Sequence, residues 1–170
     1  MAHDPHPNPD PGAALADEVA AQDDVMERLL YVYKSHMAQL CRQANLTMPQ
    51  LYALDTIARL HRSKMSPLAE RLGLSMGASS TLVDRLATRG LVQRDADAAD
   101  RRAVYVSLSE KGQRLLEEAR QARTELLHRV FAQLEPGVRA TLATSLSALL
   151  EAWNTLPSPG TPPGLACLDE

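Results

Sequence analysis

The 170-residue chain has few cysteines, few aromatic residues and no long apolar run. Two cysteines, Cys41 and Cys167, are too few for a disulfide framework and lack the spacing of metal ligands. No apolar run approaches the roughly 18–20 residues that a membrane helix needs. The polar, proline-rich residues 1–12 lack the basic and apolar segments of a secretory signal. We therefore expect a protein of the reducing cytoplasm with no membrane partner.

Motifs of the common enzyme classes are also absent. The sequence contains no glycine-rich phosphate loop, no nucleophile elbow and no His-Glu-x-x-His motif. Its five histidines include no pair that could ligate a metal from one face of an expected helix. We expect no enzyme, no catalytic residues, no metal site and no cofactor.

The residues that are present favour a helical core and a basic middle. Apolar residues make up 45% of the chain but aromatic residues only 4%, so Leu, Ala, Val and Met must fill the core, which suits helices. The segment from Arg59 to Arg114 holds 11 basic and 6 acidic residues, whereas the rest of the chain holds 7 and 15. A basic middle between acidic ends indicates a central module that binds an anion such as nucleic acid.

Apolar periodicity and proline positions divide the chain. Prolines alternate through residues 1–12 and crowd residues 157–170, so both segments are expected to be disordered tails. Between the tails, a stripe from Val25 to Leu40 predicts an amphipathic helix that ends near Asn45. A long helix is expected from Ser109, and a last helix after Pro136.

Helix caps and turn residues predict the central elements. Thr47 is expected to cap a second helix, and Ser66, followed by Pro67 at the first helical position, a short third helix that Gly73 stops. Ser75 is expected to cap a fourth helix. Two β-rich runs, 91–94 and 104–108, then surround a charged loop and predict a hairpin.

The two helices around Gly73 predict a helix-turn-helix, whose second helix enters the major groove of DNA. If Leu82 and Leu86 face the core, Ser75 and Ser79 also turn inward. The alternative is an ordinary surface helix with a polar face. The predicted DNA-contacting residues of this helix are Ser75, Met76, Gly77, Ala78, Ser80, Thr81, Asp84 and Arg85.

The charged loop after this helix carries Asp100, Arg101 and Arg102. An arginine at a hairpin tip can enter the minor groove, where the potential is negative, and a nearby carboxylate can orient it. We interpret the loop as the wing of a winged helix. The alternatives are a solvated loop, or a winged helix that contacts only proteins.

Several segments of the chain resemble the MarR family of winged helix-turn-helix regulators. The matching segments are Leu46-Thr47-x-x-Gln50, Leu68–Ser75, Leu82–Leu86, Arg89–Val92, Arg94, Asp100–Ala103 and Val106–Gly112. The resemblance implies a mostly α-helical fold with a small β-hairpin wing, in which Arg102 reaches the minor groove and Asp100 orients it. Ser79 departs from the small aliphatic residue or valine that is common in the family, and Thr81 from a frequent basic residue.

The resemblance also implies a domain arrangement and a homodimer. A DNA-binding domain is expected at 47–108, and a helical dimerisation region at 13–46 and 109–156. Apolar stripes on the first and last helices are expected to be buried between the two chains. The predicted interface residues are Val25, Leu29, Leu142, Leu146, Leu149, Leu150 and Trp153.

The resemblance implies a regulator, in particular a repressor, that binds a pseudo-palindromic operator in double-stranded DNA and releases it when a small aromatic or phenolic ligand binds. The candidate ligand-binding residues are Tyr33, His36, Met37, Leu40 and Tyr52; ordinary helix packing is the alternative. A redox-sensing regulator of the same fold is a further alternative, in which Cys41, otherwise a small buried apolar residue, reacts with oxidants, alone or with Cys167.

Overall fold

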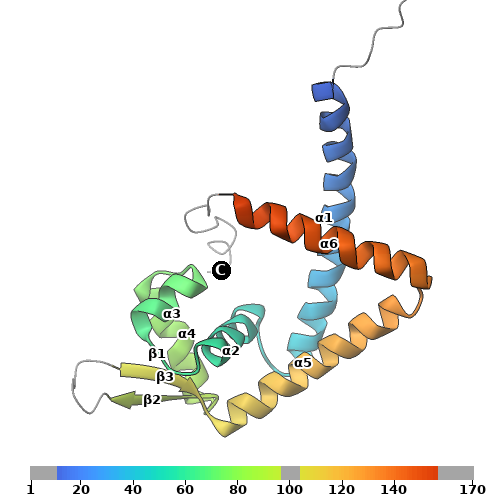
Figure 1. Cartoon of the computed structure of the whole chain (residues 1–170). Helices are drawn as coiled ribbons and strands as arrows, with labels where there is room; N and C mark the ends of the chain where they lie inside the picture. Colours follow the sequence, from blue (N-terminus) through green and yellow to red (C-terminus); the bar gives the residue numbers. More distant parts are fainter. Residues whose placement is uncertain (1–10, 97–103, 157–170) are drawn as a thin grey trace, which may run out of the picture. The chain divides into compact units, whose positions relative to one another are not determined.

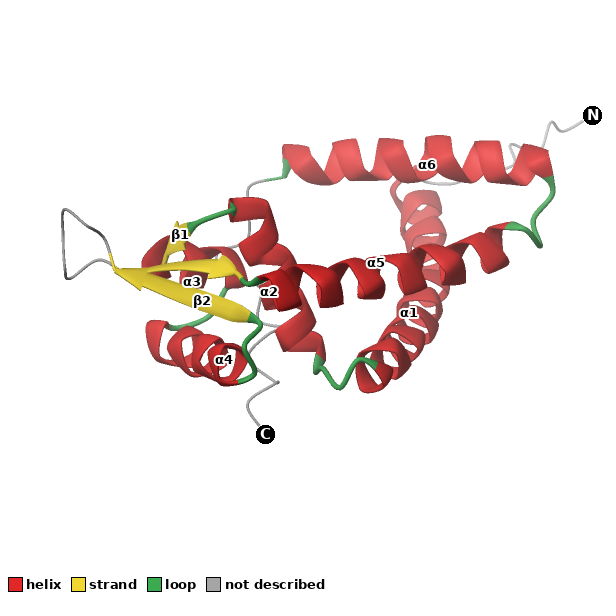
Figure 2. Cartoon of the chain, turned by 90° about the horizontal axis from the view of Figure 1, so that it is seen from below, coloured by secondary structure: helices red, strands yellow, loops and turns green. Residues whose placement is uncertain are grey.

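Helices account for most of the computed structural model, which describes residues 11–96 and 104–156 (Figures 1 and 2). The expected fold class, mostly helical with a small β-hairpin, is confirmed. The helices are α1 (Pro11–Gln43), α2 (Met48–Leu60), α3 (Met65–Leu72), α4 (Met76–Thr88), α5 (Glu110–Phe131) and α6 (Pro136–Thr155). The strands are β1 (Ser63–Lys64), β2 (Val92–Ala96) and β3 (Val104–Leu108).

The chain divides into two units, one up to Gln39 and one from Leu40 onward. The described part of the first unit consists of most of α1, which begins at Pro11, inside the range 1–12 that the sequence predicts to be a tail. A proline fits there because the first turn of a helix has no use for its missing N–H. The helix ends at Gln43, close to the predicted end near Asn45.

Two of the predicted caps of the central helices are confirmed and one is wrong. The Thr47 hydroxyl accepts a hydrogen bond from the Gln50 N–H, and Gln50 Oε1 accepts one from the Thr47 N–H. Ser75 Oγ accepts from the Ala78 N–H at 3.2 Å. Ser66, however, is the second residue of α3, whose N-cap is Lys64 without a side-chain bond. Pro67 is tolerated at the third position because that N–H also has no partner within the helix.

The sheet has three antiparallel strands in the order β1-β3-β2. The predicted hairpin is confirmed: β2 pairs with β3 from Val92 opposite Leu108 to Ala96 opposite Val104. The edge strand β1 was not predicted. It contributes only two pairs, Ser63 with Val106 and Lys64 with Tyr105, which is too short for any periodicity to show.

The core of the second unit lies between the sheet and helices α2, α3 and α4, with the first turns of α5 at one end. Its members are aliphatic, as the scarcity of aromatic residues required. The largest fully buried hydrophobic side chains are Leu54, Ile57, Leu68, Leu72, Val83, Leu86, Leu91 and Val106. Leu116 of α5 belongs to the same cluster.

The start of α5 is bound to the segment between α4 and β2. Ser109 donates its N–H to the Leu91 carbonyl and its hydroxyl, at 2.6 Å, to the Gly90 carbonyl, while its Oγ accepts from the Gly112 N–H. A Cβ at Gly112 would overlap the Leu91 carbonyl oxygen. Lys111 Nζ donates to the Arg89 carbonyl at 2.8 Å. The Ser-x-x-Gly motif therefore holds α5 against the end of α4, and only glycine fits this approach.

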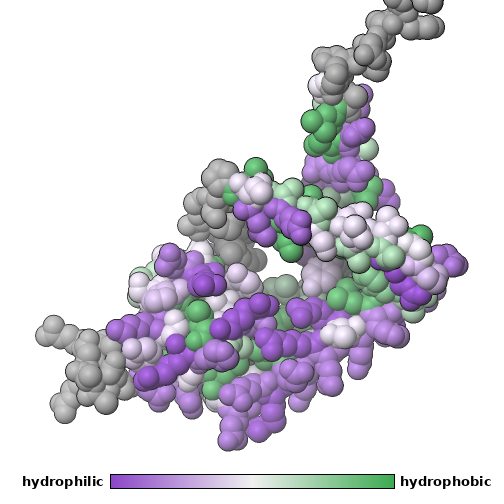
Figure 3. Space-filling model, viewed as in Figure 1, coloured by the Kyte–Doolittle hydropathy of each residue, from purple (hydrophilic) through white to green (hydrophobic). Residues whose placement is uncertain are grey.

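Helix α6 buries no residue in the single chain. Figure 3 shows apolar and near-neutral surface along α6, whereas the visible side of α5 is mainly hydrophilic. No helix within residues 11–96 and 104–156 is long and apolar enough to cross a bilayer.

Candidate nucleic-acid interface

Helix α4 has two distinct faces. Ser79, Val83 and Leu86 are buried on one, and Thr81 and Asp84 are exposed on the other. Ser79 therefore turns inward as expected, but Ser75 does not. As the N-cap, Ser75 has an extended backbone outside the helical repeat, so the spacing that buries Ser79 does not apply to it.

A tight turn sets α4 against α3. Gly73 adopts a left-handed conformation (φ 68°) that ends α3 and is readily accessible to glycine. Two residues later Ser75 caps α4. The two helices with this turn form the predicted helix-turn-helix, and the turn places the first residues of α4 at the surface.

The exposed start of α4 carries small side chains and one flexible apolar side chain. Gly77 is exposed, Ala78 and Ser80 are half-buried, and Met76 is 50% exposed. The Thr81 hydroxyl donates to the Gly77 carbonyl at 3.1 Å, so its proton is used inside the helix. Thr81 therefore offers only an acceptor to a partner outside.

An ion pair joins α4 to the hairpin. Asp84 Oδ1 lies 2.7 Å from a guanidinium nitrogen of Arg94 on β2. The helical repeat predicts that Asp84 lies on the outer face of α4, but it predicts no role for Arg94. The matching motif contained Arg94, yet no spacing rule relates a helix residue to a strand ten positions later, because their proximity depends on the α4–β2 turn.

The remaining predicted DNA-contacting residues divide into two groups. Arg85 is exposed on α4, as expected for a residue that can reach DNA. Asp100, Arg101 and Arg102 lie within 97–103, outside the residues that the structure describes. Their roles stay predictions.

The candidate ligand-binding residues differ in burial. Met37 is buried and Leu40 half-buried, whereas Tyr33 and Tyr52 are 36% and 48% exposed. His36 is exposed, and its Nδ1 lies 2.8 Å from the Val32 carbonyl oxygen, one turn earlier in α1. A ligand site formed by these residues stays a prediction.

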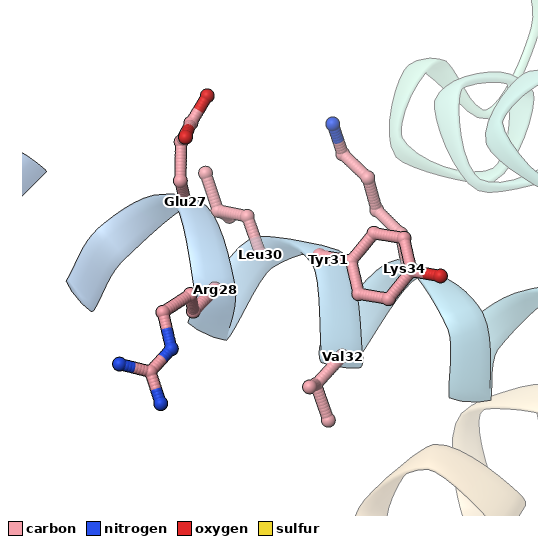
Figure 4. A pocket seen from close by; sticks show the side chains of 6 residues that line it. All are labelled: Glu27, Arg28, Leu30, Tyr31, Val32 and Lys34. Carbon is pink, nitrogen blue, oxygen red and sulfur yellow. The ribbon is translucent and has the colours of Figure 1, made fainter. Parts of the chain in front are cut away.

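Three surface hollows among the described residues lie away from these side chains. One, on α1, is lined by Glu27, Arg28, Leu30, Tyr31, Val32 and Lys34. Its side chains come from one stretch of helix and diverge, with Glu27 and Lys34 on one side and Arg28 and Val32 on the other (Figure 4). Two further hollows lie on α6 and on α5 alone. A single helix cannot enclose a ligand, so these hollows are open surface.

The thiol of Cys41 is buried, and burial disfavours its charged thiolate form. Cys41 is 3% exposed, and its Sγ lies 3.3 Å from Met48 Sδ. Burial raises the pKa of the Cys41 thiol above its ordinary value. A thiol with a raised pKa forms little thiolate, which is the species that reacts with oxidants. Cys167 lies outside the described residues.

No three His, Cys, Asp or Glu side chains within 11–96 and 104–156 are arranged to hold a metal ion. Several charged side chains of the second unit instead pair with one another. Asp55 of α2 accepts hydrogen bonds from Arg59 at 2.7 Å and from Arg120 of α5 at 2.8 Å. This network ties α2 to α5.

Comparison with known proteins gives consistent matches. The profile of the MarR family matches residues 46–104. The chain is 31% identical over 109 residues to the uncharacterised HTH-type transcriptional regulator ML2140 of Mycobacterium leprae, covering 64% of this chain and 76% of the relative. It is 26% identical over 109 residues to the HTH-type transcriptional repressor MdtR of Bacillus subtilis, covering 64% and 70%.

Among solved structures, a mutant of S. aureus MepR bound to an oligodeoxyribonucleotide is similar in fold. Its TM-score is 0.63 at 19% identity, and the match covers 78% of this chain and 97% of that one. At this identity the likeness shows the shared fold.

Proposed function

Because the chain belongs to the MarR family of transcriptional regulators, we propose that it binds an operator in double-stranded DNA as a homodimer and represses transcription. The observation that carries this proposal is the two-faced helix α4. Its buried face fixes it to the core, while its exposed start has no side chain long enough to keep DNA bases away, except the flexible Met76.

The exposed face of α4 has the chemistry of a major-groove reader. Gly77, Ala78 and Ser80 allow close approach of the helix to base edges. Thr81, whose proton is engaged with Gly77, accepts from the amino group of adenine or cytosine. The helix carries little positive charge on this face, so phosphate contacts must come from other elements.

Asp84 acts as a positioning residue for Arg94 in this proposal. Their ion pair fixes the guanidinium at the boundary between α4 and the hairpin. Arg94 retains further N–H donors that can bind a phosphate oxygen beside the major groove. Asp84 thus contributes to DNA binding without reading a base.

The homodimer is supported by the apolar surface that the single chain leaves exposed. Val25 and Leu29 of α1 are 58% and 57% exposed, and Leu150 and Trp153 of α6 are 62% and 64% exposed. Leu146 and Leu149 continue the stripe of α6, with Leu142 half-buried beside them. A two-fold dimer buries such stripes, and its two α4 helices then require a pseudo-palindromic operator.

The wing provides the first test of the function. Arg102→Ala should weaken operator binding by about 1–3 kcal/mol and make the salt dependence shallower by about one unit per protomer. Arg102→Lys should rescue little, because a narrow minor groove favours the planar guanidinium. Asp100→Ala should cause a smaller loss. The measurement is an operator titration at several salt concentrations, with circular dichroism as the folding control.

Arg101→Ala is the matched control, because it removes the same charge from the neighbouring position in the sequence. Equal losses for Arg101→Ala and Arg102→Ala would show that the loop contributes only diffuse charge. An unchanged affinity for Arg102→Ala would show that the wing does not read DNA. If the wild type lacks salt-dependent binding to any duplex, the alternative of a protein-interaction module replaces this function.

We also propose that a small aromatic carboxylate or phenol releases the DNA. Of the residues predicted for this ligand, Tyr33, His36 and Tyr52 are exposed and each carries a group that can bind a polar atom, whereas Met37 is buried and Leu40 half-buried. A coupling of about 1–3 kcal/mol changes DNA affinity roughly 5–150-fold, and DNA must weaken ligand binding equally. A calorimetric screen with and without operator tests this. If no such compound binds but peroxide releases the DNA, Cys41 becomes the sensor.

A further inference from the structure

Two cations at the edge of the sheet share one aromatic ring. The Arg62 guanidinium carbon lies 3.9 Å from the centre of the Tyr105 ring, and Lys64 Nζ lies 5.6 Å from the same centre. The strand register explains the second contact, because Lys64 of β1 pairs directly with Tyr105 of β3. Tyr105 is one of only four tyrosines in the chain.

These cations differ from the paired arginines of the same unit. Arg59, Arg94, Arg114 and Arg120 each form an ion pair with a carboxylate. Neither Arg62 nor Lys64 forms an ion pair with any residue in the described parts of the chain, and both are exposed. An aromatic face restrains a cation through its quadrupole without neutralising the charge. Both positive charges are therefore held in place and remain available.

The position of the cluster limits what it can bind. Lys64 is the N-cap of α3, the first helix of the helix-turn-helix, and Tyr105 lies on the strand that carries the chain away from the wing. Two unneutralised cations side by side repel each other, and an anion between or beside them relieves that repulsion. Duplex DNA carries such anions as the phosphates of its backbone.

We propose that Arg62 and Lys64, restrained by Tyr105, form a phosphate-binding site that contacts the backbone of duplex DNA beside the groove read by α4. The site rests on the proposed DNA-binding function and adds to it a contact that carries no sequence information. Phosphate contacts of this kind fix the orientation of a protein on the duplex. One acidic residue opposes the site: exposed Asp95 of β2 pairs with Tyr105 from the other side and repels a phosphate there.

The double variant Arg62→Ala/Lys64→Ala tests the charges. It should weaken binding to an operator and to a mixed-sequence duplex by the same factor, and flatten the plot of log affinity against log salt by about two units for each bound protomer. The matched control, Arg129→Ala/Arg139→Ala, removes the same charge from exposed positions on α5 and α6 and should leave this slope unchanged. Asp95→Asn should strengthen binding to both duplexes.

Variants of Tyr105 test the restraint. Tyr105→Phe keeps the ring and should bind DNA like the wild type. Tyr105→Leu keeps both cations, but it should weaken binding to both duplexes, with little change in the slope of log affinity against log salt. An unchanged slope in the double variant, while the wild type binds DNA, would overturn this site and leave the proposed function standing. A wild type that binds no duplex would overturn both. A loss confined to the operator would overturn the phosphate assignment, because it would mean base reading.

Discussion

The lobe from Leu46 to Leu116 and helix α6 contain similar aliphatic residues but place them differently. In the lobe, leucines such as Leu54, Leu68 and Leu86 have no exposed surface. In α6, Leu146, Leu149 and Leu150 are 42–62% exposed. The lobe therefore has a complete core within one chain, whereas α6 exposes apolar residues that only another surface can cover. In the proposed homodimer, the second chain would cover this stripe of α6.

Breaking the proposed partner surface should have the largest effect. Leu146→Asp with Leu150→Asp places two carboxylates where the dimer would bury leucines, which costs several kcal/mol. We expect monomers by light scattering, while the lobe keeps its near-native circular dichroism. The DNA affinity should fall with the loss of the second half-site contact.

The control for this prediction is Thr144→Asp with Ala148→Asp. These residues have the same spacing as Leu146 and Leu150 but lie on the opposite side of the helix, at 100° per residue. The control should stay dimeric. A monomeric wild type at micromolar concentration would contradict the proposed assembly, as would two variants that dissociate equally.

Disturbing the complete core should have the next largest effect. Gly112→Ala forces a methyl group against the Leu91 carbonyl and should destabilise the lobe by about 1–3 kcal/mol, because the approach involves backbone that cannot easily move. Thermal unfolding measures it. Gly77→Ala is the matched control: nothing lies within 4 Å of its added Cβ, so it should be neutral or stabilise the helix by about 0.5–1 kcal/mol. If both variants lose the same amount of stability, the close contact between Gly112 and the Leu91 carbonyl does not explain the effect.

The link between the lobe and α5 should contribute less. The Asp55 side chain is 22% exposed and that of Arg120 37%. In a double-mutant cycle of Asp55→Asn and Arg120→Gln, we expect a coupling of about 1 kcal/mol or less, as for other partly exposed pairs. A coupling of zero would show that the pair does not hold α2 to α5.

The same pair predicts a pH dependence. Burial raises the pKa of Asp55, but hydrogen bonds from Arg59 and Arg120 and their charges lower it by more, so it lies below its ordinary value of 3.8. The stabilisation is complete above pH 3.8 and is lost as the pH falls through the lowered pKa. The free energies of unfolding of the wild type and of Asp55→Asn, measured with denaturant, should therefore converge as the pH falls through that acidic range. If the difference between the two free energies stays constant there, the lowered pKa of Asp55 is wrong.

The smallest expected effect concerns Cys41. In a Cys167→Ser background, the only remaining thiol should react slowly with a disulfide reagent at neutral pH, because it is buried and its pKa is raised. Denaturant should make the reaction fast. Peroxide should leave the DNA affinity of this variant unchanged. Fast labelling of the native protein would instead support the redox alternative.

The sequence determined the local elements of the lobe because their signals are local. Thr47, Ser75 and Ser109 cap helices through bonds to residues three positions later, so each cap is readable from a short stretch. The burial of Ser79 followed from its spacing to Leu86. The predicted cap at Ser66 was wrong because a serine before a proline is also compatible with the first turn of a helix that has already begun.

Only the tertiary structure decided which distant residues meet. Strand β1 is too short to show a pattern, and it exists because β3 offers it backbone partners. The pairing of Asp84 with Arg94, of Asp55 with Arg120, and of Arg62 and Lys64 with Tyr105 depends on turns and strand register. Periodicity in a sequence reports which face of one element is buried, but the contacts between elements are set by how those buried faces pack together, and that is a property of the whole core.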